Sequence, residues 1–256
     1  MDTASPVLEL KDVSVCFNKE TILSQVNLRV MAGERIAVIG PSGKGKSVLL
    51  KTLAGLIKPT QGSVFIQGVS WWIPESYSKR LGLLKNMGML FQKNALFDSL
   101  TCGENIAFPL REASSLSEIE IQEVVVNFLN AVGISHALNL YPEEISGGMQ
   151  KRLGIARALA LNPTIVFYDD PTAGLDPITS RKIIELICDL QIKHQSTFVA
   201  ITNDMNRAYQ MAHRILMVVE QQVIEAGTPI SIKKNFDPRV RQFIHGELTG
   251  PLTVMK

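Results

Sequence analysis

Eight consecutive residues combine glycines with a lysine and a serine at a spacing that binds phosphate. They match G-x-x-x-x-G-K-[ST] at every fixed position. The loop consists of Gly40, Pro41, Ser42, Gly43, Lys44, Gly45, Lys46 and Ser47. Glycines let backbone N–H groups turn inward around an anion, and a helix that starts there adds its partial positive charge. We therefore predict a phosphate-binding loop, with Lys46 on the β- and γ-phosphates and Ser47 on Mg²⁺.

The segments beside the loop supply the elements that it needs. Residues 35–39 are an apolar run typical of a buried strand, and residues 47–53 begin a helix. A glycine-rich turn that binds nothing is the alternative interpretation of the eight residues. The order of strand, loop and helix favours the phosphate loop over that alternative.

Composition indicates an ordinary globular protein. The chain has 256 residues, a net charge of +2 and 46% hydrophobic residues, enough for one large domain or two closely packed subdomains. No basic block stands out, so no nucleic acid is expected as a partner. Apolar runs are of strand length, short of the ~20 residues that cross a bilayer. With no signal-peptide pattern and three scattered cysteines, we expect a cytoplasmic protein.

The hydrophobic pattern predicts an α/β fold. Residues 8–17 and 22–30 alternate between apolar and polar, as in an N-terminal antiparallel β subdomain with one buried face. Further strands are expected at residues 63–66, 87–91, 164–169, 196–202 and 214–220, with helices at residues 178–194 and 205–213. Such alternation implies a parallel sheet covered by helices on both faces, as in a P-loop NTPase core.

Between about residues 94 and 161 the periodicity becomes helical, which predicts an inserted helical subdomain. Its clearest helix carries apolar residues at helical spacing, namely Ile121, Val124, Val125, Phe128, Leu129 and Val132. Ser117 and Glu120 form a plausible capping box at the start of that helix.

A second group of chemically active residue types follows the apolar run at residues 165–168. A P-loop protein needs an acid at this place to hold Mg²⁺ through its water shell, and Asp169 fits that role. A solvated acidic turn is the alternative for this segment alone. The sequence P-T-A-G-L-D-P follows at residues 171–177, and S-G-G-M-Q opens a helix at residues 146–150. Together with the phosphate loop, these segments form a highly specific combination.

In this order the motifs resemble those of the ATP-binding subunits of ABC transporters, over nearly the whole chain. The resemblance implies an ATPase that binds ATP and Mg²⁺. It implies that Phe17 stacks on adenine, and that Gln92 meets Mg²⁺ and the attacking water. It further assigns nucleotide binding to Ser146, Gly147, Gly148 and Asp176, although Ser-Gly-Gly alone would be a simple helix cap.

The resemblance also implies partners. Two copies would pair head to tail, so that each Ser-Gly-Gly helix presents its N-terminus to the γ-phosphate held by the other copy. A serine at a helix start can supply a hydroxyl and N–H groups to an anion. The dimer would bind an integral membrane permease and lie peripherally on the cytoplasmic side of the inner (plasma) membrane.

Two residues depart from the family pattern. Asp170 stands where a glutamate usually polarises the attacking water, and Asn203 stands where a histidine usually contacts the γ-phosphate. Aspartate keeps the carboxylate but displaces it by about 1 Å, which can cost about a hundredfold in rate if nothing compensates. Asparagine keeps an N–H donor but cannot titrate. A slow or inactive ATP-dependent clamp is therefore an alternative to a fast ATPase.

Three segments resemble the Mla-type ATPases of MCE-associated lipid transporters: residues 94–97, residues 105–112, and residues 237–243 with Gly250 and Pro251. This resemblance implies phospholipid as the cargo, with an MCE-type lipid-binding protein and a small accessory protein as further partners. The ATPase of an amino-acid or metal importer shares every catalytic motif and stays an alternative. We expect a nucleotide-binding domain at residues 1–235 and an interaction tail at residues 236–256, for which a frayed terminus is the alternative.

Overall fold

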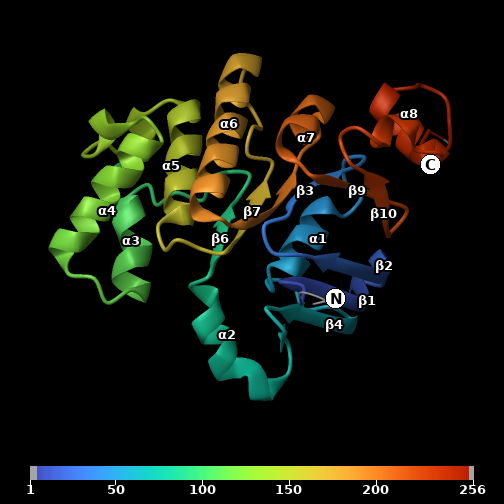
Figure 1. The fold of residues 1–256 in the computed structure, drawn as a ribbon, viewed down its shortest axis with the longest axis horizontal. Coiled ribbons are helices and arrows are strands. Elements are labelled where there is room, and N and C mark those ends of the chain that lie inside the picture. Colours follow the sequence, from blue (N-terminus) through green and yellow to red (C-terminus); the bar gives the residue numbers. More distant parts are fainter. Residues whose placement is uncertain (1–4, 254–256) are drawn as a thin grey trace. The chain divides into compact units, whose positions relative to one another are not determined.

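The computed structural model describes residues 5–253 (Figure 1). The chain divides into two compact units. The first unit contains the N-terminal segment up to Arg80 and the C-terminal segment from Phe198, and the second is Leu81–Thr197. This division falls inside the segment predicted as one nucleotide-binding domain. The predicted domain boundary after residue 235 stays a prediction.

The first unit contains an antiparallel sheet near the N-terminus. Its strands, in spatial order, are β2 (Glu20–Val30), β1 (Leu8–Phe17), β4 (Gln61–Ile66) and β5 (Val69–Ser70). Every pairing is antiparallel. The apolar alternation buries Leu8 and Leu10 on one face, and helix α1 (Lys46–Leu53) contacts β1, β2 and β4 (Figure 1). The predicted antiparallel β subdomain is confirmed.

The first unit also contains the strand that feeds the phosphate loop. Strand β3 (Arg35–Ile39) pairs in parallel with both β8 (Thr197–Ile201) and β9 (Arg214–Val219). Strand β10 (Gln222–Gly227) pairs antiparallel with β9, and helix α7 (Met205–Met211) packs against β3. The three parallel strands are almost continuously buried, as expected of a sheet centre. The end of β3 is therefore held on both sides where the glycine loop begins.

The described part of the predicted tail folds around one glutamine. Helix α8 (Pro238–His245) follows a 3-10 turn at Ile232–Lys234, and its Val240 is fully buried. The Gln242 side chain accepts a hydrogen bond from Leu252 N (2.7 Å) and donates one to Glu247 O (3.1 Å). These contacts fold residues 246–253 back onto α8, so a frayed terminus does not describe residues 236–253.

The second unit is built from two parallel strands and several helices. Strand β6 (Met87–Leu90) pairs with β7 (Ile165–Asp169). Helices α3 (Cys102–Ala113), α4 (Glu118–Ala131) and α5 (Gly147–Leu159) pack on one another (Figure 1). The remaining elements are α6 (Pro177–His194) and 3-10 turns at Ser135–Ala137 and Pro142–Glu144. Helix α2 (Tyr77–Leu84), preceded by a 3-10 turn at Pro74–Ser76, contains the boundary between the units and was not predicted.

Helix α4 begins where its capping box predicts. The Ser117 hydroxyl accepts from Glu120 N (3.4 Å), and the Glu120 carboxylate accepts from Ser117 N (2.7 Å). Five of the six predicted apolar positions are buried, and Val124 is half-buried. No helix among residues 5–253 combines the length and apolar character required to span a bilayer.

Close packing of β6 on α5 predicts that Gly88 tolerates no side chain. A Cβ atom at Gly88 would overlap the carbonyl oxygen of Ala158, whereas a Cβ at Gly82 on α2 would meet nothing within 4 Å. We expect Gly88→Ala to lower the free energy of unfolding by about 1–3 kcal/mol through overpacking. The matched Gly82→Ala change should raise it by about 0.5–1 kcal/mol, because alanine is the better helix former. Urea unfolding of both variants measures this, and equal effects would contradict the packing described.

Candidate nucleotide-binding and hydrolysis site

The backbone of the phosphate loop requires glycine at two of its positions. Gly40 has φ 136°, and a Cβ there would overlap the carbonyl oxygen of Val218 in β9. Gly45 has φ 101°, and a Cβ there would lie 2.8 Å from Ile22 Cγ2 in β2. Both dihedrals lie in the region that side chains disfavour. The loop is therefore shaped by close backbone approach to two neighbouring strands.

Lys46 is the buried cation of this loop. Its side chain is 7% exposed, and its ammonium donates to Gly40 O (2.7 Å) and Pro41 O (3.0 Å). Helix α1 starts at this residue, has no acidic residue in its first turn, and is capped by no side chain in the described part of the chain. A helix start with a lysine and glycine-shaped backbone suits a phosphate anion. These residues fit the phosphates of ATP.

The predicted Mg²⁺ ligands are of the type that this ion prefers. Ser47 is the second residue of α1, directly after Lys46. Within residues 5–253 no group of three or more His, Cys, Asp or Glu side chains could hold a metal ion. Mg²⁺ is usually held by one or two protein groups together with substrate phosphates and water. The assignment of Ser47, Gln92 and Asp169 to Mg²⁺ stays a prediction.

Phe17 lies at the end of β1, where the β1–β2 hairpin turns. Its ring is 46% exposed, and it pairs in register with Glu20. Ile22, two residues beyond Glu20, is the residue against which Gly45 of the phosphate loop packs. The tip of the hairpin therefore lies beside the loop, with an aromatic ring available for stacking.

Asn203 is brought to the same loop by the register of two parallel strands. Val38 of β3 pairs with Ile201 of β8, and Thr202 N donates to Val38 O (3.1 Å). Continuing this register by two residues would place Asn203 level with Gly40. The first unit thus contains the phosphate loop, Phe17 and Asn203, and the nearness of Asn203 to the loop stays a prediction.

The second unit gathers the other predicted catalytic residues at one edge of its strand pair. Leu90 of β6 pairs with Tyr168 of β7, so the residues that follow, Gln92 and Asp170, leave the sheet at the same end. Asp169 is buried, and Asp170 has φ 49°. Aspartate and asparagine tolerate this left-handed conformation better than most residues do. The backbone therefore favours the short carboxylate over glutamate at position 170.

Ser146 and Asp176 both begin helices. The Ser146 hydroxyl accepts from Met149 N (3.3 Å) at the start of α5, which has no acidic residue in its first turn. The Asp176 carboxylate accepts from the backbone N–H groups of Ile178 (2.9 Å) and Thr179 (3.0 Å) at the start of α6. Hydrogen bonds from Thr179, the side-chain one foremost, lower the pKa of Asp176. Gly148 approaches Thr179, since a Cβ on Gly148 would lie 3.1 Å from Thr179 Cγ2, so the two helix starts are neighbours.

Two cations on α5, the buried Lys151 and the half-buried Arg157, were not predicted from the sequence. Lys151 is 4% exposed, and its ammonium donates to Gln92 O (2.6 Å). Arg157 donates to Ala95 O (2.7 Å) and Asn94 O (2.8 Å). Burial lowers the pKa of Lys151, and the negative charges of Asp170 and Asp169 oppose that change. The sequence held one sign that Lys151 is buried. This residue lies four positions before the apolar Ile155, and therefore on the apolar face of its helix.

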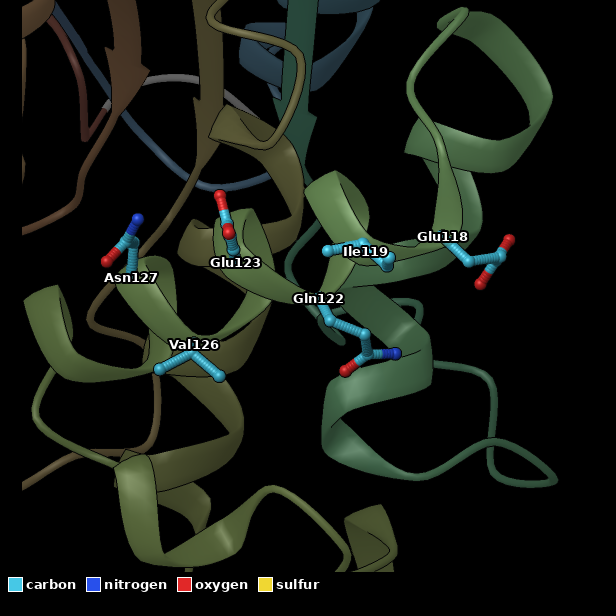
Figure 2. A pocket seen from close by; sticks show the side chains of 6 residues that line it. All are labelled: Glu118, Ile119, Gln122, Glu123, Val126 and Asn127. Atoms are coloured by element: carbon cyan, nitrogen blue, oxygen red, sulfur yellow. The ribbon is translucent and has the colours of Figure 1, made fainter.

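A shallow hollow on α4 holds none of the predicted ligands. Its volume is about 710 Å³, and Figure 2 shows its lining side chains, all from this one helix. They are Glu118, Ile119, Gln122, Glu123, Val126 and Asn127. It contains no cation for a phosphate and no glycine-shaped backbone. The hollow is therefore not a nucleotide site.

Comparison with known proteins assigns the family. The sequence profile described as "ABC transporter" matches residues 23–173. The probable ribonucleotide transport ATP-binding protein mkl of Mycobacterium leprae is 38% identical over 246 residues, which are 96% of this chain and 70% of mkl. The intermembrane phospholipid transport system ATP-binding protein MlaF of Escherichia coli K12 is 35% identical over 247 residues, which are 96% of this chain and 91% of MlaF.

Solved structures agree with this assignment. The dimeric ATP-binding cassette MJ0796, in a post-hydrolysis state bound to ADP and Pi, matches with a TM-score of 0.76 and 32% identity, covering 85% of this chain and 98% of that one. The cbiO1 protein from Clostridium perfringens, part of the ABC transporter complex cbiONQ, matches with a TM-score of 0.80 and 26% identity, covering 95% and 96%. The chain belongs to the ABC transporter family, as an ATP-binding subunit with ATPase activity. The predicted fold class, family and enzyme class are confirmed.

The position of Phe17 predicts a measurable stacking contribution. We expect Phe17→Ala to weaken ATP binding by about 1–3 kcal/mol, as when a base loses an aromatic partner, and Phe17→Trp to bind about as tightly as the natural chain. Phe236→Ala removes another highly exposed ring and should leave ATP affinity unchanged. Titration with a fluorescent ATP analogue measures all three. Normal binding by Phe17→Ala would mean that another group covers the adenine.

Proposed function

We propose that the protein couples ATP binding and hydrolysis to the transport of phospholipid through an integral membrane permease. The exposed start of α5 carries the part of this proposal that concerns ATP binding between two copies. Ser146 and Gly147 form an anion-accepting helix N-terminus that faces solvent in the single chain. Such a site is completed by the phosphate of a nucleotide on a second copy. The dimeric state of the MJ0796 cassette, to which this chain is similar, supports this pairing.

In the proposed cycle each residue has one task. Lys46 and the loop hold the β- and γ-phosphates, and Phe17 covers the adenine. Asp170 orients and polarises the attacking water, while Asn203 donates an N–H to the γ-phosphate. When bound, Mg²⁺ neutralises charge that develops on the phosphate oxygens, and Ser47, Asp169 and Gln92 would hold it. Asp176 contributes at the paired site by fixing the start of α6 next to α5.

The cargo and partners rest on likeness to relatives. MlaF is named for phospholipid transport and mkl for ribonucleotide transport, so the two names differ over the cargo. Phospholipid is favoured because residues 94–97, 105–112 and 237–243 resemble the corresponding segments of Mla-type ATPases. We propose a permease, a small accessory protein and an MCE-type lipid-binding protein as partners, with the dimer peripheral on the cytoplasmic side of the inner membrane.

Isolation of the native complex tests the cargo. Affinity purification from gently solubilised membranes should recover a permease together with phospholipid, identified by mass spectrometry. Recovery with a permease for ribonucleotides, amino acids or metal ions, without phospholipid, would reject the lipid assignment. The ATPase assignment would survive that result.

Asp170 distinguishes a working ATPase from an ATP-dependent clamp. We expect Asp170→Asn to abolish hydrolysis but not ATP binding, because the amide has the same shape and tolerates φ 49° but cannot act as a base. ATP should then trap the closed dimer, seen by size-exclusion chromatography. Asp189→Asn, at an exposed position of α6, is the matched control and should turn over normally.

The longer carboxylate tests the departure from the family. Asp170→Glu should raise turnover only if the shorter side chain limits the rate. The left-handed backbone works against glutamate, so a fall in turnover would show that the local conformation is adapted to aspartate. Natural turnover no faster than that of Asp170→Asn would leave only the clamp hypothesis.

We also propose that residues 236–256 contact the second copy or an accessory protein. Phe236 and Leu248 are almost fully exposed, whereas Val240 is buried. Truncation after Asn235 should keep ATP binding by the monomer and weaken assembly. Because truncation also removes buried Val240, the double substitution Phe236→Ser and Leu248→Ser tests the surface alone. Undiminished assembly of both variants, measured by pull-down with the permease, would exclude the contact.

A further inference from the structure

Three polar side chains fix the segment that follows β6, which we call the Gln92 loop (residues 92–101). Lys151 and Arg157 hold its beginning through the carbonyl oxygens of Gln92, Asn94 and Ala95. Asn105 on α3 holds its end. Its side chain is 0% exposed, accepts from Phe97 N (2.9 Å) and donates to the carbonyl oxygens of Phe97, Leu100 and Thr101 (3.0–3.1 Å).

The contacts to α5 are specific to the backbone of this loop. Asn94 and Ala95 have φ 59° and 51°, so their carbonyl oxygens point in directions that an extended chain would not give. Arg157 bonds both oxygens, and its guanidinium lies 5.5 Å from the centre of the Phe97 ring. A charge-assisted hydrogen bond is roughly twice as strong as a neutral one. Loss of either cation therefore releases the loop at a defined point.

Lys151 is buried, so its hydrogen bond to the loop is shielded from water. A buried ammonium is costly unless it is hydrogen-bonded, and Lys151 reaches Gln92 O at 2.6 Å from the second turn of α5. Gly154, one turn further along, lets the helix approach the loop, since a Cβ there would lie 2.6 Å from Leu90 Cδ1 and 3.6 Å from Asn94 Cβ. The helix and the loop are thus packed and bonded along three successive turns of α5.

We propose that Lys151 and Arg157 are positioning residues that make the Gln92 loop move as one body with α5. This inference rests on the proposed function, in which Ser146 at the start of α5 receives the partner's phosphate and Gln92 would help to hold Mg²⁺. Any displacement of α5 that follows phosphate contact is then delivered to the backbone of Gln92 through two bonded cations. Lys151 and Arg157 touch neither substrate nor metal in this scheme.

The test uses the full chain and two independent readouts. Lys151→Met keeps the apolar stem and removes the donor. The loop amides should exchange hydrogen at least about tenfold faster, because those of Asn94 and Phe97 are hydrogen-bonded in the intact loop. The kcat of ATP hydrolysis should fall about tenfold to a hundredfold, as for a misplaced group, while KM for ATP changes by less than about twofold.

Matched variants separate positioning from general destabilisation. Lys151→Arg restores a cationic donor and should recover most of kcat and of the exchange protection. Lys182→Met removes an exposed lysine from α6 and should change neither readout. Arg157→Met should act on the same loop, and the double variant with Lys151→Met should lose less kcat than the product of the single losses, since both hold one segment.

Each outcome decides the proposal. A loop that stays protected in Lys151→Met, or one that loosens without loss of kcat, overturns it. Fully multiplicative losses of kcat in the double variant also overturn it. If Lys151→Met fails to fold, Arg157→Met carries both readouts. If the natural chain hydrolyses no faster than Asp170→Asn, the proposed function fails by itself, and hydrogen exchange still decides whether these cations hold the loop.

Discussion

The close approach of Gly40 to the backbone of Val218 is the constraint on which the nucleotide site depends. It fixes the direction in which the chain leaves β3, and it leaves no room for any side chain at that point. Gly40 O and Pro41 O then accept hydrogen bonds from the Lys46 ammonium at the start of α1. The shape of the anion site is thus set by backbone geometry. The buried side chains of β3, β8 and β9 contribute by packing these strands in place, which fixes the backbone around Gly40.

Helix α5 unites the functions assigned to the second unit. Ser146 caps the start of this helix. Lys151 in its second turn donates to Gln92 O, and Arg157 further along donates to Asn94 O. In the proposed cycle these groups serve different steps, yet one helix positions them all. Building functional groups on one helix keeps their spacing fixed while the unit moves, which loops cannot do equally well.

The sequence was informative where physical demands are local. The strand, loop and helix around Lys46 and the capping box at Ser117 follow from neighbouring residues, and the structure shows them at these positions. Helix α2 was missed because none of its residues is fully buried and it contains Gly82, so it lacks the pattern of a core helix. The contacts of Lys151 and Arg157 join residues about 60 positions apart, and φ 49° at Asp170 leaves no sequence signal. Such features depend on tertiary packing, which a linear pattern does not encode.

The central claim is that residues 40–47 bind the phosphates of ATP through Lys46. The most direct measurement is the ATP affinity of Lys46→Ala by equilibrium titration, with thermal unfolding as the control for folding. Because Lys46 is the buried cation at the start of α1, the substitution should remove most of the affinity and leave the chain folded. A folded Lys46→Ala protein that binds ATP as tightly as the natural chain would contradict the account.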